Sequence, residues 1–302
     1  METSRAQTVL RVLAFAAIVT AWGFNYPFVR IGLEVAPPLW LATLRAATGT
    51  AGTALLFLGL PQGEPLDRAG KLHALLLGIP NTALFFGLWF SAGASVPPGE
   101  ASILIYTFPL WVTILSGPVL ARPPTSMEWV SVALGFLGVA LVTQPWAASG
   151  TATGVGPLVE LLLAAVCWGV ATVLFKRRFR PGQMPQANGY QLLGGSVALA
   201  LAAFVVEPDA IPVPSPLLIG VVLYMGLVGT ALAYTLWFGL LARYHASTLS
   251  TYTFLVPVVA LAASAVLFRE GLDLAQATGV GLVCVGIYLT GRHAAQGVSE
   301  PS

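Results

Sequence analysis

Charged side chains are scarce in this chain of 302 residues, of which only 9% are Asp, Glu, Lys or Arg. An ordinary soluble domain carries about 25% charged residues, so this sequence cannot supply the surface of a water-soluble globular protein. The formal net charge, +2, is also small. Because proteins that bind nucleic acid gather many cations on one face, we predict no nucleic-acid partner.

Cysteine and catalytic patterns are nearly absent as well. Cys167 and Cys284 stand apart inside apolar runs without CxxC or Cys/His spacing, and we interpret both as small buried hydrophobic residues. No GxSxG, HExxH or Walker A spacing occurs, which argues against an enzyme and against an ATP-driven pump without a nucleotide-binding partner. The sequence thus predicts no catalytic residue, no metal site and no cofactor.

Apolar sequence is what the chain has in abundance, since 57% of its residues are hydrophobic. Most of its uncharged runs approach or exceed the roughly 20 residues that a bilayer-spanning helix needs. The runs cover residues 12–29, 46–63, 72–99, 101–121, 129–159, 161–175, 181–206, 210–242, 246–268 and 274–291. We predict an all-α polytopic membrane protein with ten transmembrane helices, the first of them retained rather than cleaved as a signal sequence.

Lysine and arginine are distributed unevenly between the two sets of loops. Eleven of the 14 lie at the N-terminus or in loops on one side, namely Arg5, Arg11, Arg68, Lys71, Arg122, Lys176, Arg177, Arg178, Arg180, Arg243 and Arg292. The alternate loops hold only Arg30 and Arg269, and Arg45 lies inside the second helix. The positive-inside rule then places both termini in the cytoplasm, as expected for a multi-pass protein of the cell (inner) membrane whose surroundings are the lipid bilayer.

A nine-residue sequence occurs twice in the chain with three substitutions. "TALFFGLWF" begins at position 82 and "TALAYTLWF" at position 230, and six of their nine residues are identical. Other matches keep nearly the same spacing: Trp22 and Trp168 are 146 residues apart, and Pro109 and Pro257 are 148 apart. The chain therefore consists of two related halves with five predicted helices each.

Five helices per half give the halves opposite directions in the membrane, because an odd number of spans returns the chain to the far side. Such inverted repeats recur in secondary transporters, where the solute site lies between the repeats near the middle of the bilayer. We expect a first repeat over residues 8–146, an external linker over 147–154 and a second repeat over 155–292.

Several motifs resemble a known family. They are "AWGFNYPFVR" in helix 1, "CWGVATVLFK" in helix 6, "TFPLWVTILSG" in helix 4 and "TFLVPVVALAASAVLFREGLDLAQATGVGLVCVGIYL" through helices 9 and 10. They resemble the ten-helix form of the drug/metabolite transporter superfamily, which is built from two EamA-type units. The first half departs from the closing pattern, because Arg122 stands where the second half has Glu270.

The resemblance implies a secondary transporter that carries small polar metabolites by alternating access. Members of this kind are often exporters of amino acids or related compounds, as in the YddG-like amino-acid exporters. A channel or facilitative pore for small solutes is the alternative. The partner is then a small-molecule substrate, and the oligomeric state is left open, with a monomer allowed.

Paired prolines mark candidate gates. Pro109 and Pro257 occupy matching positions inside helices 4 and 9, and a proline there removes one helical hydrogen bond. The carbonyls of Ile105 and Thr253, four residues earlier, are expected to become free acceptors. Matching interrupted helices in two repeats point to a transporter's binding site, although a kink that only shapes helix packing is the other reading.

Aromatic and amide side chains within the spans are the candidates for substrate contact. A ring-lined cavity with a few hydrogen-bond donors suits zwitterions that carry apolar groups. Packing and interfacial aromatic belts are the competing explanation. The predicted substrate-binding residues are Trp22, Asn25, Tyr26, Arg45, Asn81, Trp89, Tyr106, Trp168, Gln191, Tyr234, Trp237 and Tyr252.

Arg45 is the most informative of these, because a charge within a membrane span is costly and requires an anion. It either forms a structural brace with Glu34, Glu100 or Glu160 or receives a substrate carboxylate. The sequence places no carboxylate near the middle of any span, and a membrane proton relay normally needs one, or a histidine. We therefore expect facilitated or weakly coupled transport, with Glu100 and Glu160 as fallback proton sites.

Overall fold

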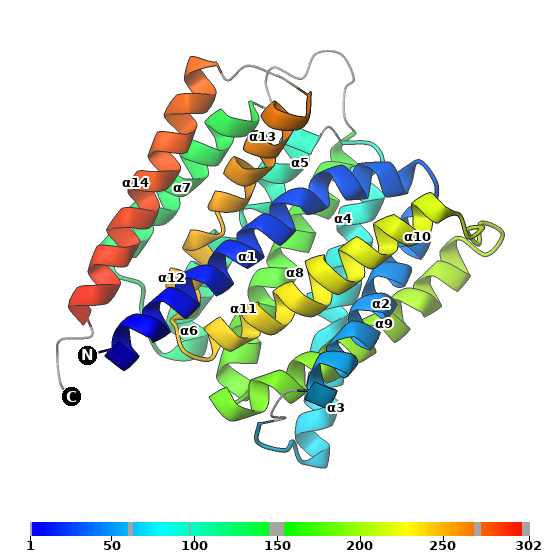
Figure 1. Cartoon of the computed structure of the whole chain (residues 1–302), viewed down its shortest axis with the longest axis horizontal. Coiled ribbons are helices and arrows are strands. Elements are labelled where there is room, and N and C mark those ends of the chain that lie inside the picture. Colours follow the sequence, from blue (N-terminus) through cyan, green and yellow to red (C-terminus); the bar gives the residue numbers. More distant parts are fainter. Residues whose placement is uncertain (1, 60–62, 97, 145–153, 269–272, 298–302) are drawn as a thin grey trace.

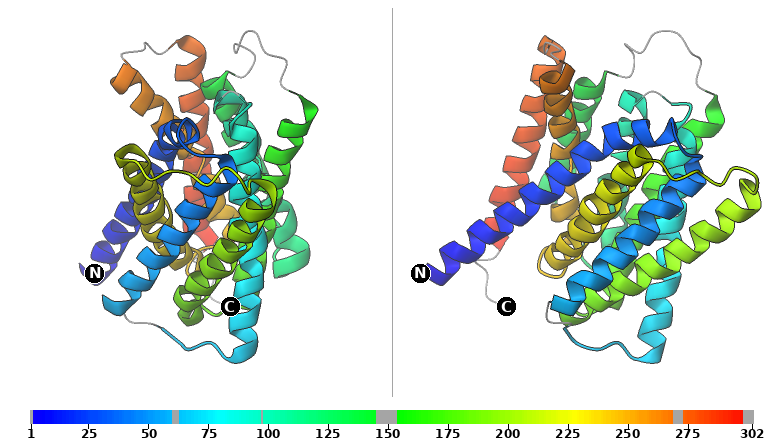
Figure 2. Two further views of the ribbon diagram at one scale, coloured as in Figure 1. Left: turned by 90° about the vertical axis from the view of Figure 1, so that its right-hand side faces the viewer. Right: turned by 45° about the vertical axis from the view of Figure 1, so that its right-hand side comes forward.

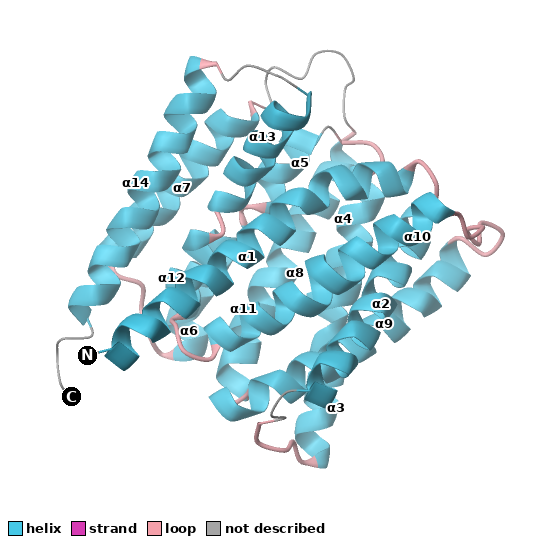
Figure 3. Ribbon diagram, viewed as in Figure 1, coloured by secondary structure: helices cyan, strands magenta, loops and turns pink. Residues whose placement is uncertain are grey.

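The structure is a computed structural model, and it describes residues 2–59, 63–96, 98–144, 154–268 and 273–297. Within these ranges every regular element is a helix (Figure 3). The first half contains α1 (Glu2–Leu33), α2 (Pro38–Gly59), α3 (Arg68–Gly78), α4 (Phe85–Gly93), α5 (Pro98–Ile105), α6 (Phe108–Leu120) and α7 (Ser126–Thr143). The second contains α8 (Val155–Arg178), α9 (Met184–Val206), α10 (Pro216–Leu223), α11 (Ala233–Leu241), α12 (Ala246–Tyr252), α13 (Leu255–Phe268) and α14 (Leu274–Gly297).

Eight helical segments of the described chain are long and apolar enough to cross a membrane. Two shorter apolar segments, Ala246–Ala262 and Leu274–Thr290, follow them and coincide with the predicted helices 9 and 10. The prediction of an all-helical membrane protein is confirmed. The predicted linker over 147–154 lies outside the described residues, apart from Gly154.

Two of the predicted spans contain π-helical turns at matching positions. Ile79–Leu84 joins α3 to α4, and Tyr224–Leu232 joins α10 to α11. In the first turn Pro80 has no N–H to donate, and in the second Thr230 donates its hydroxyl to the carbonyl of Met225 at 2.9 Å. Both features interrupt the regular i to i−4 ladder. The repeated nonapeptide therefore begins inside a π-helical turn in each half.

Two further predicted spans are broken where the prolines lie. The chain leaves α5 at Tyr106 and re-enters a helix at Phe108, and it leaves α12 at Thr253 and re-enters at Leu255. Pro109 then occupies the first turn of α6, where its missing N–H is not needed. The regular α-helix is thus interrupted for two residues at each site, where backbone hydrogen bonds with i to i−3 spacing continue the turn.

The two halves run in opposite directions at their first helices. In Figure 1, α1 starts at the lower left and rises, whereas α8 starts at the top and descends. We call the end of the bundle that carries the start of α1 and the end of α14 the terminal face, and the opposite end the distal face. The end of α7 and the start of α8 both lie at the distal face (Figure 1).

Matching residues of the two halves meet each other between α2 and α9. The hydroxyls of Thr50 and Ser196, which are 146 residues apart, share a hydrogen bond of 2.9 Å. Arg45 in α2 donates its Nε to Thr230 at 3.0 Å, and Thr82 donates to Gln191 in α9 at 2.8 Å. Gln191 is the counterpart of Arg45, and Thr82 is the counterpart of Thr230, so the two contacts join equivalent positions with the halves exchanged. A local two-fold axis produces this pattern.

A second pair of matching helices, α7 and α14, packs side by side, and the right-hand view in Figure 2 places α14 at the edge of the bundle. Glycines allow the close approach: a Cβ on Gly138 would lie 2.7 Å from the carbonyl oxygen of Gly279. Small residues at such contacts are the usual way in which membrane helices come close together.

Candidate functional site

A small closed cavity lies among the helices that carry the predicted site residues. Its volume is about 40 Å³, on a scale where one water needs about 10–15 Å³, so it holds a few waters and no larger solute. Its walls are formed by Trp22, Asn25, Tyr26, Arg45, Phe85, Trp89, Ile105, Tyr106, Phe108, Trp168 and Tyr234. Eight of the twelve residues that the sequence proposed for substrate binding therefore converge on one point.

Aromatic rings form most of the wall. The matching residues Trp22 and Trp168 meet edge to face with ring centroids 5.9 Å apart. Tyr234 and Phe85 lie 5.2 and 4.8 Å from Trp168. Edge-to-face pairs of this kind are favourable and geometrically specific. The rings give the cavity a rigid apolar wall.

Polar atoms without partners face this apolar surrounding. Trp22 donates its Nε1 to the carbonyl of Gly229 at 3.2 Å. In contrast, four other lining residues each contain a buried polar atom with no hydrogen-bond partner: Asn25 Oδ1, Arg45 Nη1, Trp168 Nε1 and Tyr234 Oη. An unsatisfied buried polar group costs about 1–3 kcal/mol. A polar ligand or water in the cavity would therefore be stabilised.

Arg45 is held firmly but its charge is not neutralised. Only 1% of the residue is exposed, and its guanidinium carbon lies 4.1 Å from the centre of the Phe86 ring. Its Nη2 lies 3.5 Å from the carbonyl oxygen of Gly229, in addition to the bond from Nε to Thr230. These neutral partners and the ring face orient the cation. None of them supplies a counter-charge.

The brace that the sequence left open for Arg45 does not form with the described carboxylates. Neither Glu34 nor Glu160 makes an ion pair with it, and the Glu100 side chain lies outside the described residues. The ion pair that the described chain contains joins Arg122 to Glu128 at 3.0 Å near the terminal face. Arg45 thus has a buried positive charge beside an empty space.

Tyr26 and Tyr106 close the side of the cavity toward α5. The Tyr26 hydroxyl lies close to the side chains of Ser102 and Tyr106, and Tyr106 stands between α5 and α6. A displacement of the two half-helices at this break would move one wall directly. This geometry connects the predicted hinge to the site.

Four predicted residues lie elsewhere. Asn81 donates to Gln191 at 3.1 Å inside a buried polar cluster between the first π-helical turn and α9. Trp237 is fully buried behind Trp22, and Tyr252 lines a separate groove near the terminal face. The structure places none of these four on the cavity wall.

The predicted free carbonyls need one correction. The carbonyl of Thr253 accepts the N–H of Val256 at 2.9 Å, because the chain tightens to i+3 spacing at the break. It is therefore not a free acceptor. The hydroxyls of Thr107 and Thr253 each bond a carbonyl three residues earlier, so the Thr-Phe dipeptide, rather than proline alone, shapes both breaks.

Two phenylalanines that line the cavity were not predicted from the sequence. Phe85 belongs to the repeated nonapeptide, and Phe108 follows the break directly. Phenylalanine has no polar atom and resembles any other apolar residue of a membrane span. Their positions next to a repeated motif and a helix break were the available signals.

A larger vestibule lies next to the cavity at the distal face. It has a volume of about 410 Å³ and includes Arg30, Glu34, Gly93 and Ala94 in its wall. Tyr26 and Trp89 line both the vestibule and the cavity, and their ring centroids are 5.5 Å apart. This aromatic pair separates the cavity from the distal face.

At the terminal face a cavity of about 540 Å³, the terminal cavity, is lined by Lys176, Arg177 and His245 among others but shares no lining residue with the central cavity. Lys176 corresponds to Arg30, and Leu241 and Ala242 correspond to Gly93 and Ala94. The Lys176 ammonium donates to the carbonyls of Leu241 and Ala242, at 2.5 and 3.3 Å, at the end of α11. The two ends of the molecule therefore differ at residues that the repeat makes equivalent.

Comparison with known proteins agrees with this arrangement. The profile of the EamA-like transporter family matches residues 10–144 and 157–292. The uncharacterized transporter YvbV of Bacillus subtilis (strain 168) is 28% identical over 296 residues, which are 95% of each chain. A "Probable amino-acid metabolite efflux pump" of Salmonella typhimurium (strain LT2) is 27% identical over 283 residues, covering 90% of this chain and 91% of the relative. A crystal structure with 20% sequence identity has a TM-score of 0.75 and covers 94% of this chain and 98% of its own.

Proposed function

This chain belongs to the EamA-like transporter family, and on that premise we propose that it exports amino acids or related carboxylate-bearing metabolites across the cell membrane by alternating access. The family and the similar proteins are transporters and not enzymes. The name of the Salmonella relative, an amino-acid metabolite efflux pump, supports the substrate class and the direction.

The observation that carries the proposal is the state of Arg45. It is a buried cation without a counter-charge, and its Nη1 has no partner at a cavity lined by aromatic rings. A carboxylate placed there would form charge-assisted hydrogen bonds, which are roughly twice as strong as neutral ones. The rings would contact the apolar part of the same molecule. A small metabolite with one carboxylate and an apolar body complements both features.

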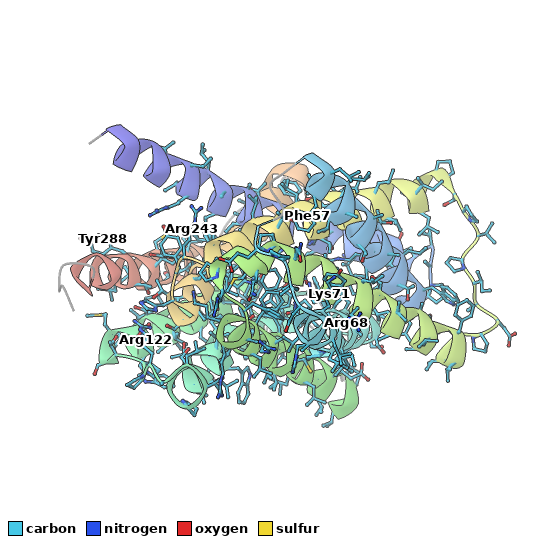
Figure 4. All side chains as sticks on the ribbon, turned by 90° about the horizontal axis from the view of Figure 1, so that it is seen from below. Phe57, Arg68, Lys71, Arg122, Arg243 and Tyr288 are labelled. Atoms are coloured by element: carbon cyan, nitrogen blue, oxygen red, sulfur yellow. The ribbon has the colours of Figure 1, made fainter. Side chains whose placement is uncertain are left out.

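We infer ten spans arranged as two inverted repeats, with the division near residue 150 that the sequence predicts. The opposite directions of α1 and α8 (Figure 1) and the reciprocal contacts of Arg45 and Gln191 support the inversion. The terminal face would be cytoplasmic. Arg68, Lys71, Arg122 and Arg243 come from three separate parts of the chain and are labelled in Figure 4, which views the molecule from this face.

Alternating access follows from the difference between the two ends. In this conformation the vestibule at the distal face reaches Tyr26 and Trp89 of the central cavity, whereas the terminal cavity beside Lys176 shares no residue with the central cavity. If the repeats exchange conformations, Arg30 takes the role of Lys176 and donates to the carbonyls of Gly93 and Ala94. The breaks beside Pro109 and Pro257 are the proposed hinges of this exchange.

Solute counterflow in proteoliposomes tests the function. Vesicles loaded with an unlabelled amino acid should take up the labelled one transiently, and competition by other carboxylates should reveal the preferred substrate. Arg45→Gln should lower uptake at least tenfold, because a hydrogen bond to a charged group contributes about 1.5–3 kcal/mol. Arg45→Lys should retain part of the activity, and Arg68→Gln, an exposed arginine, should retain all of it.

Two outcomes would contradict the proposal. Full counterflow in Arg45→Gln, with the protein folded, would exclude Arg45 as the carboxylate receptor. Flux that rises linearly with solute concentration and shows no counterflow would indicate a channel, the alternative class.

A further inference from the structure

A long apolar groove opens at the terminal face, apart from the solute cavity and sharing no residue with it. Its volume is about 500 Å³, and it lies between the start of α1 and the helices α11 to α14. Its walls are formed by Arg11, Val12, Phe15, Ala16, Val19, Thr20, Leu240, Tyr244, Leu249, Tyr252, Leu255, Val259 and Ile287. Phe15 and Tyr252 meet edge to face across it with centroids 5.5 Å apart.

The length of the groove matches one leaflet of a bilayer. Its α1 wall extends from Arg11 to Thr20, and nine steps of 1.5 Å give about 14 Å along the helix. The hydrocarbon core of a membrane is about 30 Å thick. A groove of about half that depth, lined mostly by apolar side chains, has the length of a single acyl chain.

Arg11 provides a charge at the end of this groove that lies nearest the start of α1. Its guanidinium carbon lies 5.7 Å from the centre of the Tyr244 ring, and its Nε is buried without a hydrogen-bond partner. No described carboxylate forms an ion pair with it. A cation with an unused donor at the head of an apolar groove is complementary to an anionic group that carries a hydrocarbon tail.

We propose that this groove binds one anionic phospholipid of the leaflet at the terminal face. One acyl chain lies against Phe15 and Tyr252, and the phosphate accepts hydrogen bonds from Arg11. Interfacial arginines that meet anionic headgroups act in this way. The site is independent of the solute bound in the central cavity, so it stands whatever the transported metabolite is.

Lipid binding to the purified full-length protein in detergent tests the site. Native mass spectrometry with phosphatidylglycerol and phosphatidylcholine gives the dissociation constant of each bound lipid. We expect phosphatidylglycerol to bind more tightly, and Arg11→Gln to weaken it about fivefold while leaving phosphatidylcholine unchanged. Ala16→Trp, which fills the groove, should remove the tight site for both lipids.

Arg68→Gln is the matched control, since Arg68 is an exposed arginine on the same face (Figure 4) and lies outside the groove. Equal losses in Arg11→Gln and Arg68→Gln would show diffuse attraction to the basic surface and overturn the proposal. So would an unchanged phosphatidylglycerol affinity in Ala16→Trp. Melting temperatures of the variants without added lipid establish that each one is folded.

Discussion

Thr230 is the residue that positions the buried cation. Its hydroxyl accepts the Arg45 Nε at 3.0 Å and donates to Met225 at 2.9 Å inside the π-helical turn. We expect Thr230→Val, nearly the same in shape, to leave Nε buried and unpaired, at a cost of about 1–3 kcal/mol. The apparent affinity for the transported carboxylate should fall, and Thr230→Ser should restore it.

Thr235 offers the control for this substitution. It lies five residues further along the same span, and its hydroxyl is buried with no hydrogen-bond partner. Thr235→Val should therefore leave the affinity unchanged and should not lower the melting temperature, since no hydrogen bond is lost. Similar losses in Thr230→Val and Thr235→Val would mean that the hydroxyl of Thr230 has no specific role.

His245 supplies a pH dependence outside the spans. Burial, followed by the charges of Arg122 and Lys176, lowers its pKa, and Glu128 opposes them only in part. The folded protein thus disfavours the protonated imidazole more than the unfolded chain does. This contribution to stability is complete above the ordinary pKa of about 6.5 and is lost as the pH falls through that value toward the lowered one.

The melting temperature should therefore fall between pH 7 and pH 5, and His245→Gln should reduce the fall. Arg177, which lines the same terminal cavity of about 540 Å³, adds a further positive charge near the imidazole. An identical acid response in His245→Gln would contradict the assignment.

Single residues also show how far sequence reasoning reached. Arg45 and the two tryptophans at positions 22 and 168 could be predicted, because a charge or an indole N–H within a span needs a partner. The same reasoning also assigned Gln191 and Asn81 to the cavity, where they do not lie. In sequence, an amide that is hydrogen-bonded to a neighbouring amide looks the same as one that faces a cavity. Only the three-dimensional pairing distinguishes them.

At the scale of helices, the packing of α7 on α14 depends on small residues. A Cβ on Gly138 would lie 2.7 Å from the Gly279 carbonyl oxygen, which is backbone and cannot easily move. Gly138→Ala should lower the melting temperature in detergent by several degrees, since overpacking typically costs about 1–3 kcal/mol. Thermal unfolding of the purified protein measures this.

Gly239 is a suitable comparison because it also lies within a helix, and a Cβ there would meet nothing within 4 Å. Gly239→Ala should be neutral or stabilising, as alanine favours the helix more than glycine does. If Gly138→Ala proves equally harmless, the close approach of the two helices is not a source of stability.

The all-helical membrane architecture was readable from the sequence, because most of its uncharged runs are about as long as a bilayer-spanning helix. The π-helical turns were not, since Pro80 and Thr230 lie in runs that are otherwise ordinary apolar helix. Their effect comes from a missing N–H and a side-chain bond, which leave the apolar pattern unchanged. The interruptions at Tyr106 and Thr253 could be predicted from the prolines. The contribution of the threonine hydroxyls, which bond the carbonyls of Leu104 and Ser250, could not.

At the scale of the whole molecule, the chemistry of the cavity bears on energy coupling. Its described wall contains neither a carboxylate nor a histidine. We expect counterflow in proteoliposomes to be unaffected by an imposed pH gradient. Strong proton-driven accumulation would contradict this, and Glu160→Gln would then be examined first, because one carboxylate oxygen of Glu160 is buried without a partner.

The inverted repeat makes a sharper prediction about the two ends. Lys176 holds the end of α11 through two carbonyls, whereas its counterpart Arg30 lines an open vestibule. Removing the ammonium with Lys176→Met takes away charge-assisted bonds of about 1.5–3 kcal/mol, enough to shift the two conformations about tenfold or more. The terminal face should open and the distal face should close. Arg30→Met should shift the populations in the opposite sense.

Cysteine labelling in membrane vesicles can follow both ends once Cys167 and Cys284 are replaced by alanine. A cysteine at Ser95 reports on the distal vestibule, and one at Ser116 on the terminal cavity. Lys176→Met should slow labelling at position 95 and speed it at position 116, and Arg30→Met should do the reverse. Rates that rise together at both positions would mean that the cations only stabilise the fold. Opposite changes in labelling rate at the two positions are expected only for alternating access, in which one end closes when the other opens. Each cation then stabilises the conformation in which its own end is closed.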